Sequence, residues 1–537
     1  MSTATLRIGM STCGLAAGAG ATHAALKHGI LERKLPLRLQ RTGCLGACHR
    51  EPLLEVADDD GSILYGPIVE DRVGPLLDHL SGAGDPPSAG WVVSRRADRG
   101  DYPFLGRQVK VTTQLCGVID PHSLDAYLAH GGYEALKQAL ATPPEQVIAA
   151  LKSSRLRGRG GAGFPTGLKW EISRAGEGQP KFVICNADEG DPGAFMDRTL
   201  IEGDPHRVLE GMLIAAWAIG ATKGYIYIRA EYPLAVAALR EAVVQARELG
   251  VTGTDILGSG MEFDFVIREG AGAFVCGEET ALMRSIEGYR GMPTMRPPYP
   301  SQHGLWGHST NINNVETYAS VPSILLEGPD WFAHMGTEHS GGTKAFALAG
   351  AVERSGLVEV PIGMTLREMV HEIGGGCRGG RRFKAVQLGG PSGGCIPAAL
   401  LDTRIDYEDL RATGAIMGSG GMIVADETTC MVDLARYFLA FTQDESCGKC
   451  IPCRVGTRKM LGLLTRATEG KATAADIQRL EALCATVAAT SLCGLGQTAP
   501  NPVRTTMRYF PEEYAAHVEE GRCPSGVCPM GGEGGAA

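Results

Sequence analysis

Four cysteines toward the C-terminal end of the chain have the spacing of an iron–sulfur site. Cys447, Cys450 and Cys453 form a C-x2-C-x2-C run, and Cys493 lies farther along in a Cys-Gly-Leu-Gly segment. Three closely spaced thiolates can occupy three corners of a cubane, and a thiolate from another element can close the fourth corner. A four-thiolate zinc site is the alternative, but such sites more often use two C-x2-4-C pairs. The pattern therefore favours a [4Fe-4S] cluster.

A glycine-rich loop at residues 157–167 could bind a phosphate or a flat cofactor, and Lys169 follows it closely. Glycines let a ligand approach backbone N–H groups, and the flanking arginine and lysine charges suit an anion. Three of the glycines also satisfy G-x-G-x-x-G. However, residues 144–152 have a helical pattern, whereas a strand precedes the dinucleotide-binding fingerprint. The loop is therefore not an ordinary Rossmann turn.

Two further segments present polar side chains in positions that suit a ligand. Residues 186–193 (Asn-Ala-Asp-Glu-Gly-Asp-Pro-Gly) follow a buried-looking strand at 181–185, and ligands of open α/β sheets bind at that end of the strands. Residues 311–317 (Asn-Ile-Asn-Asn-Val-Glu-Thr) present side-chain amides before a helical run. Each segment alone could be ordinary turn chemistry. Together with the glycine loop they favour a binding site.

The elements that must position these residues form several domains, because 537 residues are too many for one core. Strands and helices alternate over residues 131–340, which predicts a mostly parallel, Rossmann-like sheet with helices on both faces. The other predicted units are a small α/β domain at 1–82, a linker and lead-in at 83–130, a β-grasp-like domain at 341–428, a helical bundle around the cluster at 429–520, and a flexible tail at 521–537.

Composition excludes several classes of function. The hydrophobic and charged fractions, 44% and 21%, are those of a soluble globular protein. A net charge of -9 gives no support to nucleic-acid binding. No apolar run reaches the roughly 18 to 20 residues that span a bilayer, and the first residues lack the pattern of a secretory signal. We therefore expect a cytoplasmic protein without membrane insertion, whose 16 cysteines bind metal or stay reduced.

Residues 1–82 resemble the thioredoxin-like [2Fe-2S] ferredoxins, in which two early cysteines and a later C-x3-C pair hold the cluster. Cys44 and Cys48 match the later pair and Cys13 matches one early ligand, but residues 14–24 contain no second early cysteine. The domain is predicted to be degenerate and kept for docking, with a bound cluster as the alternative. At the other end, Cys523 and Cys528 could be additional ligands, but the glycine-rich composition around them favours a flexible end.

The motifs taken together resemble the NADH-binding flavoprotein subunit of respiratory complex I and its soluble relatives in NAD-reducing hydrogenases and NAD-dependent formate dehydrogenases. Besides the segments above, the resemblance includes Gly-Glu-Glu-Thr-Ala-Leu at 277–282 and Arg-Pro-Pro-Tyr-Pro at 296–300, and it extends over about residues 130–520. It implies FMN, an NAD(H) site and one [4Fe-4S] cluster, and it implies that the β-grasp-like segment is a ubiquitin-like domain.

The resemblance also assigns residues to the flavin and nucleotide site. Lys169 would stabilise the negative charge of a reduced flavin, Glu279 would lie close to the nicotinamide and the flavin, and both are the catalytic candidates. Phe164 and Tyr299 would contact the nucleotide, and Asp191 would lie near its ribose; relatives commonly have glutamate in place of Asp191 and often phenylalanine in place of Tyr299. The full set of cofactor-binding candidates is Gly158, Arg159, Gly160, Gly161, Phe164, Lys169, Asn186, Asp188, Glu189, Gly190, Asp191, Phe274, Gly277, Glu278, Glu279, Arg296, Tyr299, Asn313, Asn314 and Thr317.

The function that the resemblance implies is that of a diaphorase subunit, which exchanges hydride between NAD(H) and FMN and single electrons with the cluster. The additional N-terminal domain favours a soluble complex, most similar to a β subunit of NAD-dependent molybdenum formate dehydrogenase. Its partners would be a small [2Fe-2S] thioredoxin-like subunit and the large molybdenum subunit. A NAD-reducing hydrogenase and complex I are the alternatives. A non-catalytic iron–sulfur docking subunit is the rival from another class, and the intact glycine loop and Lys169 argue against it.

Overall fold

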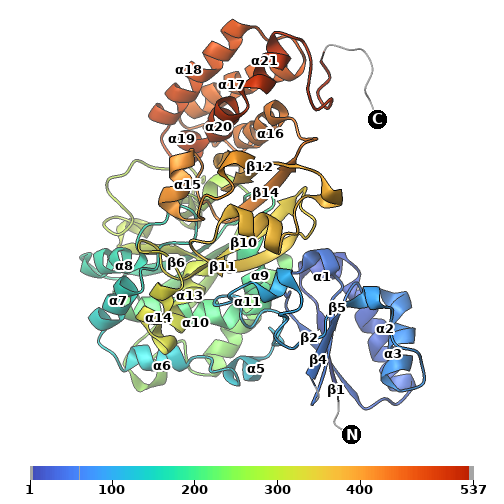
Figure 1. Cartoon of the computed structure of the whole chain (residues 1–537). Helices are drawn as coiled ribbons and strands as arrows, with labels where there is room; N and C mark the ends of the chain where they lie inside the picture. Colours follow the sequence, from blue (N-terminus) through green and yellow to red (C-terminus); the bar gives the residue numbers. More distant parts are fainter. Residues whose placement is uncertain (1–3, 60, 531–537) are drawn as a thin grey trace.

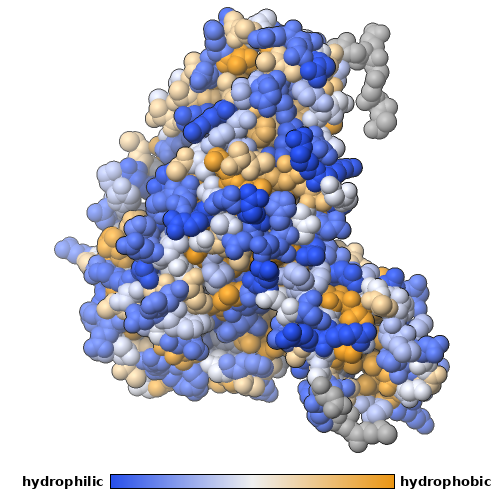
Figure 2. All heavy atoms as spheres, in the orientation of Figure 1, coloured by the Kyte–Doolittle hydropathy of each residue, from blue (hydrophilic) through white to orange (hydrophobic). Residues whose placement is uncertain are grey.

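Three β-sheets and a group of C-terminal helices make up residues 4–59 and 61–530, the part of the chain that the computed structural model describes (Figure 1). The N-terminal sheet lies to one side of a central body, and the C-terminal helices lie at the far end of that body. Polar and apolar side chains are mixed over the face seen in Figure 2, with an apolar patch on the N-terminal domain. This arrangement confirms the multidomain α/β fold class. Among the described residues, no helix is long and apolar enough to cross a bilayer.

The N-terminal domain is a five-stranded sheet in the order β2-β1-β3-β4-β5, covered on one face by two helices. β1 pairs parallel with β2, and the other pairs are antiparallel. Leu6 and Ile8 alternate along β1 and both enter the core with Leu26 and Leu76 from the helices. The elements are β1 Ala4–Gly9, α1 Thr12–Ala16, α2 Ala19–Glu32, β2 Leu37–Thr42, η1 Cys48–Arg50, β3 Leu54–Asp58, β4 Gly61–Tyr65, α3 Glu70–Leu80, η2 Ala89–Trp91 and β5 Val92–Ser94.

The central body is a parallel four-stranded sheet in the order β8-β7-β6-β9. Because side chains alternate along each strand, Val183 and Ile226 face a core built mainly on α10, α11 and α13. Ile184 and Tyr227 face the opposite side, toward α12 and the cluster cysteines. The elements are α4 Pro103–Gly106, α5 Leu124–Leu128, α6 Glu134–Leu140, α7 Pro144–Ser153, α8 Thr166–Ala175, β6 Phe182–Ala187, α9 Met196–Gly203, α10 Pro205–Ile219, β7 Lys223–Arg229, α11 Pro233–Glu248, η3 Ile256–Gly258, β8 Asp264–Gly270, η4 Phe274–Gly277, α12 Glu279–Ile286, η5 Leu305–Gly307, β9 Thr310–Asn314, α13 Val315–Glu327 and α14 Pro329–His334.

A second five-stranded sheet follows, in the order β11-β10-β14-β12-β13. Its first and last strands, β10 and β14, lie side by side and are parallel, and the other pairs are antiparallel. A helical segment connects β11 to β12, so the topology is that of a ubiquitin-like β-grasp domain. The elements are β10 Thr343–Gly350, β11 Gly356–Pro361, η6 Glu368–Ile373, η7 Arg378–Gly380, β12 Phe383–Leu388, η8 Gly390–Ser392, β13 Gly394–Pro397, η9 Ala398–Leu400, α15 Tyr407–Thr413 and β14 Gly421–Asp426.

The C-terminal helices pack around Leu439, Met460, Leu464 and Leu480. The predicted helical bundle is confirmed, and its first helix, α16, joins the β-grasp sheet to the cysteine run. The elements are α16 Met431–Asp444, η10 Pro452–Gly456, α17 Thr457–Thr468, α18 Ala474–Thr490, α19 Gly494–Thr498, α20 Asn501–Tyr509 and α21 Pro511–Val518.

The sequence predicts a flexible tail from residue 521, but residues 521–530 return to this helical domain. Cys523 is buried, and Cys528 and Met530 pack against the same helical core. The rest of the predicted tail, residues 531–537, lies outside the described residues.

Candidate functional site

The polar segments predicted to bind a ligand meet at one edge of the central sheet. β6 ends in the acidic turn at 188–191, and β9 ends in Asn313 and Asn314 at the start of α13. The two strands are parallel neighbours, so both sets of side chains lie at the same edge. From β6 the chain proceeds outward through β7 to β8 and then returns to the other side of β6 as β9. Open α/β sheets bind ligands where the strand order reverses in this way.

The glycine loop lies between α7 and α8 and packs against this edge. A Cβ atom on Gly160 would lie 3.1 Å from the Cβ of Asn314, at the start of α13. A Cβ on Gly161, which has a φ of 124°, would lie 3.1 Å from the backbone of Gly418 in the β-grasp domain. The loop is therefore held between two domains by contacts that side chains would obstruct.

Lys169 and Glu279 form an ion pair at the centre of the site, although they lie on different helices, α8 and α12. Lys169 Nζ also donates to the backbone carbonyl of Ile312 at 2.6 Å, and Arg296 lies 3.4 Å from the other oxygen of Glu279. Burial alone would raise the pKa of Glu279, but the positive charges of Lys169 and Arg296 lower it below its usual range. Glu278, the neighbouring carboxylate, accepts hydrogen bonds from the first N–H groups of α12 and caps that helix.

The acidic turn packs against η4, the short helical turn that precedes α12. Asn186 Nδ2 donates to the carbonyl oxygen of Gly277 at 2.8 Å, and a Cβ on Gly190 would lie 2.5 Å from the ring of Phe274. Asp188 is 8% exposed, and its Oδ2 has no hydrogen-bond partner among the described residues. Burial raises the pKa of Asp188 to about 7 against the opposing effect of Arg229. The turn thus offers one buried carboxylate oxygen to a ligand.

The other two acids of the turn already have protein partners. Asp191 accepts a hydrogen bond from Ser419 Oγ, and a Cβ on Gly390 would lie 2.5 Å from its carboxylate, so Asp191 faces the β-grasp domain. Burial raises the pKa of Asp191 to about 6. Glu189 accepts from two backbone N–H groups at the start of α9 and from the hydroxyl of Tyr232.

Arg159 has a structural role in addition to its place in the glycine loop. Its guanidinium is completely buried and donates to the carbonyl oxygens of Thr343, Arg157 and Gly341 at 3.0, 2.8 and 2.7 Å. Its backbone N–H donates to Thr317 Oγ1 at 2.8 Å. The side chain of Arg159, one of the cofactor-binding candidates, therefore fixes the glycine loop.

Asn313 and Asn314 likewise organise the protein around the site. Asn313 Oδ1 accepts from the indole N–H of Trp170 at 2.9 Å and from Asn311 at 2.8 Å. Asn314 caps α13 through Oδ1 and donates through Nδ2 to Asp197 at 2.6 Å. Asp197 was not predicted, since no local pattern marks it, and its second carboxylate oxygen has no partner among the described residues.

The three aromatic candidates lie in different surroundings. Phe164 and Tyr299 are 47% and 54% exposed, as side chains available to a ligand would be. Phe274 instead packs on Phe441 of α16 with ring centroids 5.4 Å apart, and its backbone N–H donates to Glu445 at 2.9 Å. Phe274 therefore connects this edge of the central sheet to the C-terminal helical domain.

The four cysteines of the predicted cluster line one pocket. Cys447, Cys450 and Cys453 come from the segment between α16 and α17, and Cys493 immediately precedes α19. Val275 of η4, Pro293, Leu492 and Leu495 contribute apolar surface to the lining, and Ser446 and Lys449 contribute the other side chains. Burial raises the pKa of the Cys493 thiol to about 11. A set of four sulfur ligands in an apolar pocket suits an iron–sulfur cluster.

Comparison with known proteins agrees with both sites. Residues 151–323 match the Nuo51 FMN-binding domain, and residues 433–517 match the NADH-ubiquinone oxidoreductase-F iron-sulfur binding region. The NADP-reducing hydrogenase subunit HndC of Solidesulfovibrio fructosivorans is 55% identical over 79% of this chain and 86% of that protein. The second NADH-quinone oxidoreductase-F protein of Rhizobium meliloti (strain 1021) is 46% identical over 79% of this chain and 99% of that protein. The chain belongs to the NADH-quinone oxidoreductase-F family.

A solved structure extends this likeness to the N-terminal domain. In the NAD+-reducing [NiFe]-hydrogenase in its H2-reduced state, a chain with 30% identity superposes with a TM-score of 0.69 over 96% of this chain and 84% of that chain. As a member of the oxidoreductase-F family, the protein is an NAD(P)-dependent oxidoreductase component of the diaphorase type, with FMN and a [4Fe-4S] cluster as cofactors.

The residues at the sheet edge fit the FMN of the oxidoreductase-F family. A Cβ at Gly160 or Gly277 would lie 3.1 Å from Asn314 or 3.4 Å from the backbone of Asp188, so a side chain at either position would crowd this edge. Asp188 has a buried oxygen, without a partner among the described residues, that could accept from a hydroxyl group. Lys169 supplies a positive charge at the same edge, and this charge would stabilise the negative charge of a reduced flavin. These features belong to residues that the sequence motifs identified.

The N-terminal cysteines are close enough to interact, as in the ferredoxin-like domain that the sequence resembles. Hydrogen bonds from the thiols of Cys44 and Cys48 lower the pKa of Cys13 to about 3, and Arg198 of the central domain lies 3.8 Å from its sulfur. Cys44 in turn lies 3.6 Å from the carboxylate of Glu51. The described residues thus bring together three cysteines and one carboxylate at the junction with the central domain.

Proposed function

We propose that this chain transfers electrons between NAD(H) and a [4Fe-4S] cluster through FMN, as the diaphorase subunit of a soluble complex. Bound FMN can take two electrons as hydride and release them one at a time, which a nicotinamide cannot do and a cluster requires. The proposal rests mainly on the contiguity of the two sites. Val275 of η4 lines the cysteine pocket, and Gly277 of the same turn contacts Asn186 and Asp188 at the sheet edge.

The protein would contribute position and charge rather than a nucleophile. Glu279 stays ionised beside Lys169 and Arg296 and holds the Lys169 ammonium at the sheet edge, where that ammonium would stabilise the negative charge of a bound, reduced flavin. The buried oxygen of Asp188 would accept from a hydroxyl of the bound cofactor. The exposed rings of Phe164 and Tyr299 would stack on the nucleotide and exclude water from it.

The identity of the catalytic partner subunit is proposed from the domains that this chain contains. The degenerate N-terminal domain is the feature that favours a NAD-dependent molybdenum formate dehydrogenase, with a small [2Fe-2S] thioredoxin-like subunit as the second partner. A hydrogenase is the second candidate, because HndC is 55% identical and a NAD+-reducing hydrogenase chain matches 96% of this chain in three dimensions. Purification of the native complex tests this choice. Molybdenum in its large subunit would support the first candidate, and hydrogenase metals without molybdenum would support the second.

Lys169→Ala tests the diaphorase proposal itself. We expect at least a tenfold loss of NADH-driven dye reduction, or loss of FMN from the purified chain, because the charge beside the flavin is removed. Lys152→Ala is the matched control, since Lys152 is an exposed lysine whose ion pair with Glu171 lies at the surface. Dye reduction and flavin content that remain at the wild-type level in the Lys169 variant would contradict the proposal.

A further inference from the structure

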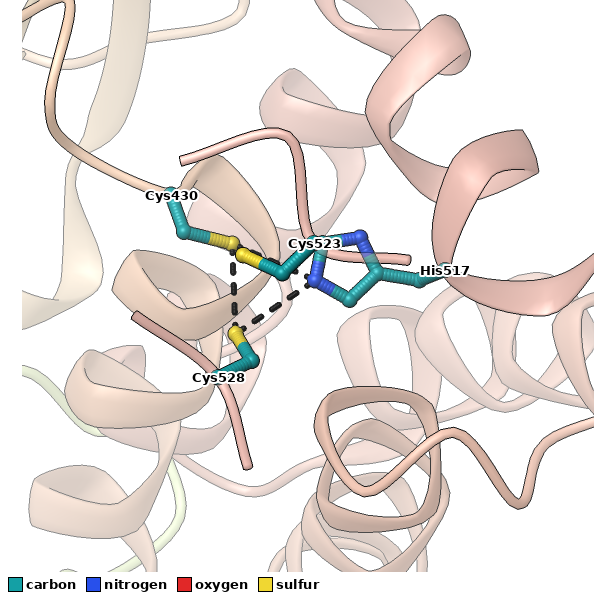
Figure 3. A group of neighbouring side chains, drawn as sticks. All are labelled: Cys430, His517, Cys523 and Cys528. Atoms are coloured by element: carbon teal, nitrogen blue, oxygen red, sulfur yellow. Dashed lines mark hydrogen bonds between the residues drawn. The ribbon is translucent and has the colours of Figure 1, made fainter. Parts of the chain in front are cut away.

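A second group of potential metal ligands lies in the C-terminal helical domain, apart from the four cluster cysteines. Cys430 precedes α16, His517 lies in the last turn of α21, and Cys523 and Cys528 lie in the segment that follows (Figure 3). The ligand atoms of all four side chains lie within 4.8 Å of one another. No local sequence pattern joins them, because Cys430 and Cys528 are 98 positions apart.

The separations between these atoms suit one metal ion. Cys430 Sγ lies 3.6 Å from Cys528 Sγ, and His517 Nε2 lies 3.5 and 3.4 Å from the same two sulfurs. Zinc–ligand bonds of about 2.0 to 2.3 Å in a tetrahedron place neighbouring ligand atoms roughly 3.5 to 3.8 Å apart. A cubane cluster carries each thiolate on a different iron, which spreads the sulfurs farther apart. The geometry therefore favours a mononuclear site.

The surroundings of His517 also prepare it for a metal. Its Nδ1 lies 2.7 Å from the carbonyl oxygen of Glu513, which requires a proton on Nδ1 and leaves the Nε2 lone pair free. Nε2 points at the sulfurs of Cys430 and Cys528 (Figure 3). A backbone acceptor on the second ring nitrogen is the usual support of a histidine metal ligand. His517 and Cys430 are only 1% and 2% exposed, so water would not complete the shell.

We propose that Cys430, His517, Cys523 and Cys528 bind one zinc ion in a closed, structural site that is independent of the [4Fe-4S] cluster. Three thiolates and one imidazole are a standard donor set for structural zinc, and a full protein shell leaves no position for catalysis. On binding, each cysteine releases a proton to solvent and its sulfur takes one coordination position.

This ion would connect residues 521–530 to the segment that carries Cys447, Cys450 and Cys453. Cys430 is at the start of α16, and the end of α16 leads through Glu445 to Cys447. Glu445 also accepts a hydrogen bond from Phe274 of η4 at 2.9 Å. The zinc would therefore fix residues 521–530 on one end of a helix whose other end supports both cofactor sites.

Metal analysis of the purified full chain tests the proposal. We expect about one zinc and about four irons per chain. The double variant Cys523→Ser/Cys528→Ser should lose at least nine-tenths of the zinc, retain its iron and FMN, and be cleaved faster after residue 520 by protease. Cys484→Ala is the matched control, because Cys484 is a buried thiol of the same helical domain outside the group, and it should keep its zinc.

A measurement on the wild-type protein avoids dependence on the folding of a variant. X-ray absorption at the zinc edge should show three sulfurs at about 2.3 Å and one nitrogen at about 2.0 Å. Three results would overturn the proposal: a chain with full iron and no zinc, a disulfide between Cys430 and Cys528, or a loss of about four irons in the double variant, which would indicate a second cluster.

Discussion

The polar side chains around the flavin edge divide into those that hold the protein together and those left for a ligand. Arg159 donates its side-chain hydrogen bonds to backbone carbonyls, and Asn313 Oδ1 accepts from other side chains of the protein. Asp188 instead keeps one buried oxygen without a partner among the described residues. An unsatisfied buried acceptor costs free energy unless a ligand supplies the donor. Removal of the cofactor should therefore have a measurable effect on stability at Asp188.

Asp188→Asn tests this through pH. Burial raises the pKa of Asp188 to about 7 in the folded protein, above the value near 3.8 of an ordinary aspartate. A raised folded pKa means that stability is full below pH 4 and is lost as the pH rises through 7. In flavin-free protein, the difference in free energy of unfolding between the variant and the wild type should be constant below pH 4 and should shift in favour of the variant by about 4 kcal/mol by pH 8. Thermal unfolding at several pH values measures this, and a constant difference would refute it.

The elements around the site are locked together by one buried ion pair. Lys344 of β10 and Glu316 of α13 are 0% and 1% exposed, and their charged groups lie 2.5 Å apart. Lys344 Nζ also donates to the carbonyl oxygen of Ser419 at 2.5 Å, next to the loop that contacts Gly161. The ion pair thus joins the β-grasp sheet to α13, next to the segment that packs on the glycine loop.

Lys344→Met should destabilise the protein by about 3 to 5 kcal/mol, because Glu316 would remain as a buried, unpaired charge. Adding Glu316→Leu should recover much of that loss, since the uncompensated charge disappears. Lys137→Met is the control, because Lys137 forms an exposed pair with Glu134 and should change stability by less than about 1 kcal/mol. Denaturant unfolding measures all three. If Lys344→Met lowered the free energy of unfolding by less than about 1 kcal/mol, as expected of the control, the ion pair would not hold these elements together.

Among the strands of the central sheet, those with apolar sequences could be predicted from the sequence and the polar one could not. β6, β7 and β8 have buried apolar runs, and the alternation of strands and helices predicted over residues 131–340 includes them. β9 was not predicted, because Thr-Asn-Ile-Asn-Asn contains one apolar residue and has the composition of a loop. Its asparagines are buried only because Trp170 and Tyr318 supply partners for their amides.

The candidate site was predictable where it depends on local motifs and not where it depends on contacts across the chain. The cysteine run, the glycine loop and the acidic turn all lie where their patterns placed them. The pairing of Lys169 with Glu279, 110 positions apart, and of Asp191 with Ser419, 228 apart, is created by folding alone. The proposed zinc ligands share this property, since Cys430 is far along the sequence from the other three and lies near them only in the folded domain.

At the scale of the whole molecule, the N-terminal domain contacts both the central domain and the β-grasp domain through the loop that carries Cys44 and Cys48. A Cβ on Gly43 would lie 2.6 Å from Gly203 of the central domain, and a Cβ on Gly46 would lie 2.3 Å from the carbonyl oxygen of Leu357 of the β-grasp domain. Thr12 also donates to Glu202 at 2.8 Å through its backbone N–H. Close backbone packing of this kind fixes the domain in one orientation.

Gly46→Ala should release the N-terminal domain without affecting the flavin site. Gly46 has a φ of 98°, and the added methyl group would overlap Leu357. Gly18→Ala is the control, because Gly18 has a φ of 104° but nothing within 4 Å of its position for a Cβ. Faster proteolysis of residues 95–102, between β5 of the N-terminal domain and α4, in the Gly46 variant alone, with unchanged NADH–dye reduction, is the expected result. Equal cleavage of both variants would contradict this docking.

The central claim is that two-electron and one-electron chemistry meet in this chain. Anaerobic titration of the purified protein with NADH, with NADPH in parallel, tests it most directly by flavin absorption and electron paramagnetic resonance. We predict that about one and a half equivalents of nucleotide, which carry about three electrons, bleach the flavin and produce the signal of a reduced [4Fe-4S] cluster. Cys493→Ser should bleach without producing that signal. A wild-type chain that holds FMN and the cluster but is reduced by neither nucleotide would contradict the account.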